Sequence, residues 1–301
     1  MSQIKRYLII TFLTTWILEF IGIHDRNIGT SAGDTSFSQA LALGMFMPSL
    51  GALLAGAKIG DMGWRLHPKK NIKPILFAWL APTVLLIAGA ALYFLIFPGD
   101  FDLTGVLMKE YDPEAYEKLM LSNTTYPEYV AKHILVSLTS FHLPVAVFLG
   151  LGEEIGWRGF LFPELDQRYG RTKAVLIGGV IHGAWHFPLM LFTGYEYGRG
   201  YIGAPLLGMI AFCVFTVSTG IISYYLYEKT CSIWLPAIYH GVVNSTFNVY
   251  LLFGSEHFER SVFGPADIGL IGGIPTLVLA VCILRAQNRR ECMELETETF
   301  E

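Results

Sequence analysis

Three apolar stretches of this chain carry polar side chains spaced four residues apart. In chain order they are Glu153-Glu154-x-x-x-Arg158, His182-x-x-x-His186 and His240-x-x-x-Asn244. Residues four apart lie on one face of a helix, so the members of each pair project from the same side. Ionisable side chains are costly at membrane depth and are rarely found there without a function. We therefore expect one catalytic centre assembled from three helices.

Helix geometry gives the two adjacent glutamates different roles. Glu154 and Arg158 are spaced as a favourable ion pair with the acid on the N-terminal side. Glu153 projects about 100° away around the helix and is the freer carboxylate, which suits a general base that activates water. The alternative is an ordinary charged helix end at the membrane boundary. The apolar residues that follow Arg158 favour the functional interpretation.

The histidine motifs offer a metal site or a set of hydrogen-bond donors. A single histidine such as His182 could be a satisfied core residue, whereas His182 and His186 on one face indicate a site. Two histidines four apart can ligate zinc, as in the HExxH motif, but here no glutamate follows the first histidine. His240 and Asn244 can donate to an oxyanion as charge develops on an attacked carbonyl. Alternatively, Asn244 bridges two helices by hydrogen bonding.

Composition indicates the elements that must position these residues. Of 301 residues, 53% are hydrophobic and 15% are charged, whereas soluble domains carry about 25% charged residues. We predict an all-α, polytopic integral membrane helical bundle with about eight transmembrane helices. The expected spans are 7–24, 38–58, 74–97, 134–152 with an extension to 165, 174–193, 204–227, 233–253 and 267–286.

Basic residues orient the predicted spans. With eight spans, the clusters at 5–6, 58–73, 168–173 and 285–290 all fall on one side, which the positive-inside rule makes cytoplasmic. Both termini are then cytoplasmic, and the acidic loop 98–133 lies outside. We expect residues 1–301 to form a single integral membrane domain, with a catalytic core at 134–253 and a polar C-terminal tail at 287–301, disordered from residue 291. A net charge of -4 without a basic, aromatic-rich patch argues against a nucleic-acid partner.

Taken together, the three motifs resemble those of the CPBP superfamily of intramembrane proteases, also called the Abi family. This superfamily includes CAAX proteases and bacteriocin-processing enzymes and is related to type II CAAX prenyl endopeptidases. The resemblance covers about 134–253 and rests on the three motifs in the family's order. Trp185-His186-Phe187-Pro188 looks like the branch whose motif continues Trp-His-x-Pro. Many members have phenylalanine where this chain has His182, so the resemblance leaves the role of His182 open.

The resemblance implies roles for the motif residues. Glu153 and His186 would activate water, Glu154 and Arg158 would support that carboxylate, and His240 with Asn244 would hold the oxyanion. Members of the family are described as metalloproteases, and the same residues also allow a metal-free glutamate mechanism, so both alternatives stay open. If a divalent metal such as zinc binds, Glu153, His186 and His240 are the expected ligands, with His182 a further candidate.

The resulting expectation is an intramembrane endopeptidase in a prokaryotic cell membrane, with its site open to the cytoplasmic side. Its partners would be membrane lipids and a peptide, or the C-terminal segment of a protein that is lipidated in CAAX-type substrates. Two alternatives belong to other classes. One is a transporter or proton-relay protein, against which we find no internal repeat. The other is a non-catalytic immunity protein that keeps the motifs.

Overall fold

The computed structural model describes residues 2–140, 142–255 and 262–299. Within these ranges the chain is all-α, as expected, and its β pairing is limited to a single bridge between Phe101 and Gly254. The helices are α1 (Gln3–Asn27), α2 (Ser31–Gly44), α3 (Met47–Ala55), α4 (Pro68–Ile96), α5 (Val106–Tyr111), α6 (Pro113–Met120), α7 (Tyr126–Thr139), α8 (His142–Gly156), α9 (Phe162–Tyr169), α10 (Arg171–Trp185), α11 (Phe187–Thr193), α12 (Leu206–Thr230), α13 (Trp234–Thr246) and α14 (Ile274–Thr299). Shorter turns are η1 (Ile59–Asp61), η2 (Pro98–Asp100), η3 (Trp157–Leu161) and η4 (Phe247–Phe253).

Five helical segments of the described chain are long and apolar enough to cross a membrane. They are Gln3–Asn27, Ser31–Ala55, Pro68–Ile96, Arg171–Thr193 and Leu206–Thr230. A sixth is obtained if Tyr126–Thr139 and Leu143–Tyr169, which are bent by 52° relative to each other, count as one broken span. The fold is therefore an all-α membrane bundle, and the number eight stays a prediction.

The two remaining predicted spans look different in the structure. In 233–253, α13 has 13 residues and passes into the 3-10 turn η4. In 267–286, the helix begins only at Ile274. The polar residues after 286 continue α14 as a helix to Thr299, whereas we expected disorder from residue 291.

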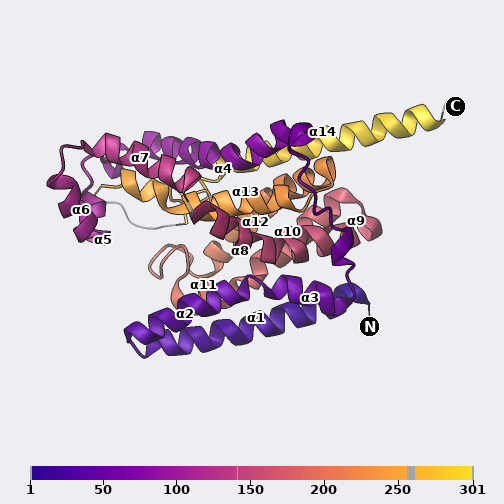
Figure 1. Ribbon diagram of the computed structural model, residues 1–301, viewed down its shortest axis with the longest axis horizontal. Helices are drawn as coiled ribbons and strands as arrows, with labels where there is room; N and C mark the ends of the chain where they lie inside the picture. The colour runs from indigo at the N-terminus through magenta and orange to yellow at the C-terminus, as the bar shows by residue number, and fades with distance from the viewer. Residues whose placement is uncertain (1, 141, 256–261, 300–301) are drawn as a thin grey trace.

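The helices form a layered bundle (Figure 1). The α1–α2–α3 hairpin lies along one side, α4 and α14 lie along the opposite side, and α8, α10, α12 and α13 lie between them. The start of α1 and the end of α14 lie at the same end of the bundle, together with α9 and the α3–α4 connection. The short helices α5 and α6 lie at the opposite end.

Glycines allow the central helices to approach each other closely. A Cβ atom added at Gly241 of α13 would lie 2.6 Å from the backbone nitrogen of Val147 in α8. One added at Gly179 of α10 would lie 2.5 Å from the Cα atom of Val217 in α12. Small residues at such crossings let helix backbones pack together in a membrane. These contacts fix the relative positions of the helices that carry the three motifs.

The loop before α5 is held by its own hydrogen bonds. The backbone N–H groups of Thr104 and Gly105 donate to Asp102 Oδ1 over 2.7 and 2.9 Å. Burial acts to raise the pKa of Asp102, but these hydrogen bonds, with those of the Thr104 hydroxyl and the Val106 N–H, outweigh it and leave the pKa below its ordinary value.

Candidate active site

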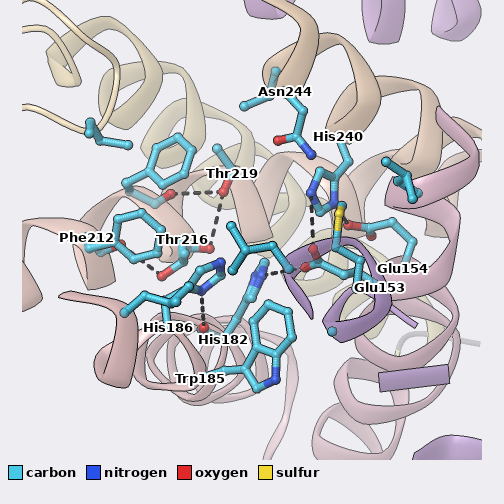
Figure 2. Close-up of a pocket in the computed structure, with 18 of the residues that line it drawn as sticks. Glu153, Glu154, His182, Trp185, His186, Phe212, Thr216, Thr219, His240 and Asn244 are labelled. Carbon is cyan, nitrogen blue, oxygen red and sulfur yellow. Dashed lines mark hydrogen bonds and ion pairs between the residues drawn. The ribbon is translucent and has the colours of Figure 1, made fainter. Parts of the chain in front are cut away.

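The three sequence motifs converge on one cavity of about 380 Å³ (Figure 2). All seven motif residues line it: Glu153, Glu154, Arg158, His182, His186, His240 and Asn244. They come from α8 and the following turn, from α10 and its C-terminal end, and from α13. The expected spatial convergence is therefore present in the structure.

The first motif runs from an α-helix into a π-helical turn. α8 ends at Gly156, and Trp157–Leu161 form the π turn η3 before α9 continues the same course. Trp157 and Arg158 begin this turn, and each donates to the carboxylate four residues earlier. A π turn is rare and often marks a functional site. Here it follows the two adjacent carboxylates directly.

Glu154 and Arg158 form the predicted ion pair inside the protein. Arg158 donates through one terminal nitrogen to Glu154 Oε1 over 2.8 Å, and both side chains are only 1% exposed. His240 Nδ1 lies 2.8 Å from the same Oε1 atom. Because a carboxylate can only accept, Nδ1 of His240 carries the hydrogen of this bond. Glu154 therefore joins Arg158 to His240 across two helices.

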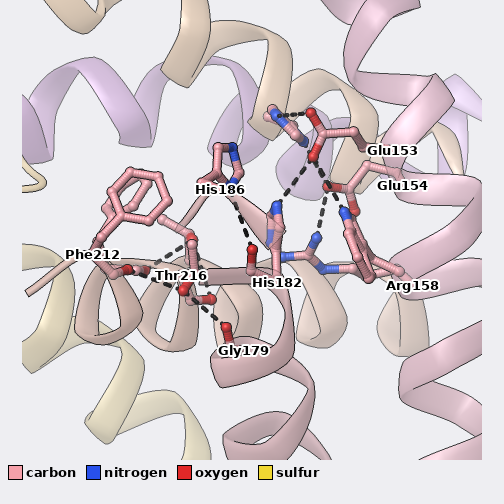
Figure 3. Close-up of polar contacts among 12 residues, drawn as sticks. Glu153, Glu154, Arg158, Gly179, His182, His186, Phe212 and Thr216 are labelled. Carbon is pink, nitrogen blue, oxygen red and sulfur yellow. Dashed lines mark hydrogen bonds and ion pairs between the residues drawn. The ribbon is translucent and has the colours of Figure 1, made fainter. Parts of the chain in front are cut away.

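Glu153 is held by two N–H groups and is less free than its position on the helix suggested. Its Oε2 atom accepts from Trp157 Nε1 over 3.2 Å and lies 3.1 Å from His182 Nε2 (Figure 3). His182 must donate this second bond, and its Nδ1 atom is then the unprotonated nitrogen, which is buried without a partner. The other oxygen, Oε1, lies 3.8 Å from His240 Nε2. Glu153 has no Arg or Lys partner among the described residues.

The sequence did not indicate Trp157 as a partner of Glu153. Its spacing of four from Glu153 was a usable signal, because indole N–H groups need an acceptor when they are buried. The Trp157 side chain is fully buried, and its ring lies against that of His182, with centroids 4.8 Å apart. Trp157 and His182 thus orient the same carboxylate and also support each other.

His186 lies at a break between two helices. α10 ends at Trp185, and Pro188 stands at the second position of α11. Proline lacks an N–H group and clashes with the carbonyl four residues earlier, which favours a break in the helix at this point. The Nδ1 atom of His186 lies 3.3 Å from the His182 carbonyl oxygen and must donate to it, which leaves Nε2 as the unprotonated nitrogen. The ring packs against Phe212 and Trp185.

Asn244 lines the cavity one helical turn after His240 and is exposed. Its place on α13 beside His240 agrees with the shared face expected from the sequence (Figure 2). Hydroxyl groups of α12 also line the cavity, although the sequence had not indicated them: Thr216, Thr219 and Ser223. Thr216 donates to backbone carbonyl oxygens of α10 and α12, at Gly179 and Phe212, so its hydroxyl is occupied by helix packing.

The candidate metal ligands do not surround a common point. No group of three or more His, Cys, Asp or Glu side chains in the described part of the chain is arranged to hold a metal ion. The contact between Glu153 and His182 is a hydrogen bond of 3.1 Å, and Nδ1 of His186 is turned to its own backbone. The donor set of Glu153, His182, His186 and His240 therefore does not fit a metal in this arrangement, and no step below is assigned to one.

Comparison with known proteins places these residues in a recognised region. Residues 135–246 match the family model described as "Type II CAAX prenyl endopeptidase Rce1-like", and this range contains all seven motif residues. The chain is 32% identical over 112 residues to "CAAX prenyl protease 2" of Methanococcus maripaludis. That match covers 36% of this chain and 41% of the relative, so the likeness spans less than half of either protein.

Proposed function

We propose that this chain, whose residues 135–246 belong to the Rce1-like family of type II CAAX prenyl endopeptidases, is an intramembrane peptidase that hydrolyses a peptide bond. The observation that carries the proposal is the carboxylate of Glu153, which lies in a cavity between hydrogen-bond donors and has no neutralising Lys or Arg. A carboxylate held in this way can accept a proton from water.

The contacts support a division of labour among the motif residues. Glu153 is the general base, and His182 and Trp157 are positioning residues that hold its Oε2 atom. The unprotonated Nε2 of His186 is a second acceptor for the attacking water, since Nδ1 is used by the backbone. Water held by two acceptors can direct a lone pair at the carbonyl carbon while Glu153 takes its proton.

The oxyanion that forms on the attacked carbonyl requires donors. The Asn244 amide supplies N–H groups from α13. Because His240 Nδ1 donates to Glu154, Nε2 can donate to the oxyanion only when the ring carries both protons. The carboxylate of Glu154 at 2.8 Å supplies the opposite charge that this cationic ring needs, and Glu153 at 3.8 Å adds to it until it takes up the proton of water. The intermediate collapses when Glu153 passes the proton that it accepted from water to the leaving nitrogen, which breaks the C–N bond and restores the Glu153 carboxylate.

We further propose that the substrate is a protein or peptide segment reached at the cytoplasmic face, in contact with membrane lipids. Support comes from the basic connections 58–73 and 168–173, which lie at the same end of the bundle as the start of α1 (Figure 1). Positive residues mark cytoplasmic loops. A prenylated CAAX-type peptide is the first substrate to test, because the family's description names that class.

The decisive test is cleavage by the Glu153→Gln variant. Purified protein in detergent is incubated with farnesylated and unlipidated CAAX-type peptides, and the products are identified by mass spectrometry. We expect the wild type to cleave at one bond and Glu153→Gln to lose at least about a hundredfold in rate, the scale of a removed general base. Glu164→Gln, which changes an acid of α9 outside the cavity, is the matched control. Full activity of Glu153→Gln in correctly folded protein would end the proposal.

A further inference from the structure

A second isolated carboxylate, Glu19 of α1, lines the same cavity and has no part in the proposed hydrolysis. Glu19 is 2% exposed, and its Oε2 atom is buried with no hydrogen-bond partner. Within the described ranges, no Lys, Arg or His side chain forms an ion pair with it. Burial of a carboxylate without a partner costs several kcal/mol of folding free energy. The position of Glu19 beside a cavity therefore indicates that its partner comes from a bound molecule.

The packing of α1 places Glu19 near the histidine end of the site. Trp16 Nε1 donates to the carbonyl oxygen of Trp185 over 3.0 Å, and Trp185 directly precedes His186. Glu19 lies about one helical turn after Trp16 on α1. The ring of Tyr195, which also lines the cavity, lies against that of His186 with centroids 6.1 Å apart. Glu19 and the proposed catalytic residues therefore face one space.

The cavity wall near Glu19 includes apolar side chains. Leu41 and Met45 come from the end of α2, and Leu189 comes from α11. A long side chain with an apolar stem and a cationic tip matches such a wall, because Lys and Arg bury their methylene groups against apolar surface and direct the charge to a polar partner. A carboxylate that receives an ammonium or guanidinium group forms a charge-assisted hydrogen bond.

The charge balance of the cavity also favours a cation. Its lining contains four glutamates, Glu19, Glu153, Glu154 and Glu196. Arg158 is the single Lys or Arg residue in this lining, and it is paired with Glu154. Glu19 and Glu153 thus face the cavity without a Lys or Arg of the lining to neutralise them.

We propose that Glu19 is a specificity-determining residue that binds the ammonium or guanidinium group of a lysine or arginine side chain in the peptide substrate. The proposal rests on the function proposed above, since it makes this cavity the place where a peptide lies. The predicted consequence is that one position of the substrate, close to the cleaved bond, prefers a basic side chain.

The test compares N-acetylated peptides that differ at one position at a time, carrying either lysine or its uncharged analogue norleucine. Acetylation removes the terminal ammonium, so the side chain is the only new cation. At one position we expect kcat/KM to be about ten- to hundredfold higher for lysine, the effect of one charge-assisted hydrogen bond. Glu19→Gln should reduce this ratio to about one, and Glu19→Asp should retain part of it. Asp34→Asn, which changes an exposed acid of α2, should leave the ratio unchanged.

Two outcomes would overturn the proposal: no position that prefers lysine in the wild type, or a lysine preference that persists in Glu19→Gln. Binding of the same peptides, labelled with a fluorophore, to Glu153→Gln protein separates this proposal from the proposed hydrolysis. A lysine preference in binding that is lost in the double variant Glu153→Gln/Glu19→Gln supports the site, even if the wild type cleaves no peptide. Equal binding of the lysine and norleucine peptides at every position overturns it.

Discussion

Removal of one charge from the buried Glu154–Arg158 pair should lower the free energy of unfolding far more than removal of both charges. In Glu154→Gln, the guanidinium of Arg158 stays 1% exposed and faces a neutral amide. Removal of one partner of a buried ion pair destabilises a protein by about 3–5 kcal/mol. Glu154 Oε1 accepts from both Arg158 and His240 at 2.8 Å, so the substitution weakens two charge-assisted bonds at once. In the unfolded state, separated membrane helices also find polar partners for their side chains. We therefore expect Glu154→Gln to lower the free energy of unfolding by about 3 kcal/mol, the lower end of this range.

The double variant Glu154→Gln/Arg158→Met contains neither charge. Replacement of a whole buried pair by uncharged residues of similar size is often nearly neutral, so we expect a cost of about 1 kcal/mol or less. Arg158→Met alone leaves Glu154 buried without its cation and should also cost about 3 kcal/mol. The coupling energy, which is the cost of the double variant minus the sum of the two single costs, is then about 5 kcal/mol in magnitude, above the roughly 0.5–3 kcal/mol usual for residues in contact. Activity should nevertheless stay low, because His240 has lost the carboxylate that orients its Nδ1 atom.

The measurement is a double-mutant cycle of unfolding free energies in one detergent, with peptide cleavage as a second readout. The chain provides a matched control in Glu164 and Arg168 of α9, which have the same spacing but are 24% and 41% exposed and lie 3.3 Å apart. Their coupling should be about 0.5 kcal/mol, as for surface pairs. If the Glu154 and Arg158 substitutions cost the sum of their separate effects, or no more than the control pair, the reasoning is refuted.

Three further changes test other contacts. His182→Phe removes a hydrogen bond to Glu153 and should lower kcat about tenfold or more with little change in KM. The reason is that a hydrogen bond to a charged group contributes about 1.5–3 kcal/mol. An unchanged kcat would show that His182 does not position Glu153. Gly241→Ala places a methyl group 2.6 Å from the Val147 nitrogen and should cost about 1–3 kcal/mol in thermal or denaturant unfolding; wild-type stability would contradict the close crossing of α8 and α13. Because the pKa of Asp102 lies below its ordinary value, its ionised form stabilises the fold above about pH 4, and this contribution is lost as pH falls through the lowered pKa. Unfolding measured from pH 6 to pH 3 should therefore show a loss of up to about 1 kcal/mol in wild type that is absent in Asp102→Asn; equal slopes would refute this assignment.

Much of the site could be predicted because part of its geometry is local. The Glu154–Arg158 pair follows from a spacing of four on one helix and is present as expected. Likewise, the apolar composition is enough to predict a bundle of membrane helices. Backbone N–H and C=O groups in lipid must bond to each other, and few structures other than helices achieve this. The convergence of the three motifs was also predictable, because polar residues on separate membrane helices avoid lipid by facing each other.

The tertiary structure decided which histidine contacts Glu153, the proposed general base. The resemblance paired His186 with Glu153 and gave His182 only a candidate role as a further metal ligand, whereas His182 makes the hydrogen bond to Glu153. Both histidines lie on one helix face, so which of them reaches Glu153 depends on how far α10 is shifted along α8. That shift is set by contacts between helices and by the break before Pro188, which turns Nδ1 of His186 to its own backbone.

The arrangement of α1 against the site likewise came only from the tertiary structure. Spacing within one segment determines neighbours on that helix, and the sequence alone therefore supplied the motifs, their helical faces and the buried ion pair. It carries no comparable rule for residues 130 or more positions apart in the chain, such as Glu19 and Glu153. Their common cavity results from packing of whole helices, through contacts such as the Trp16 hydrogen bond to α10.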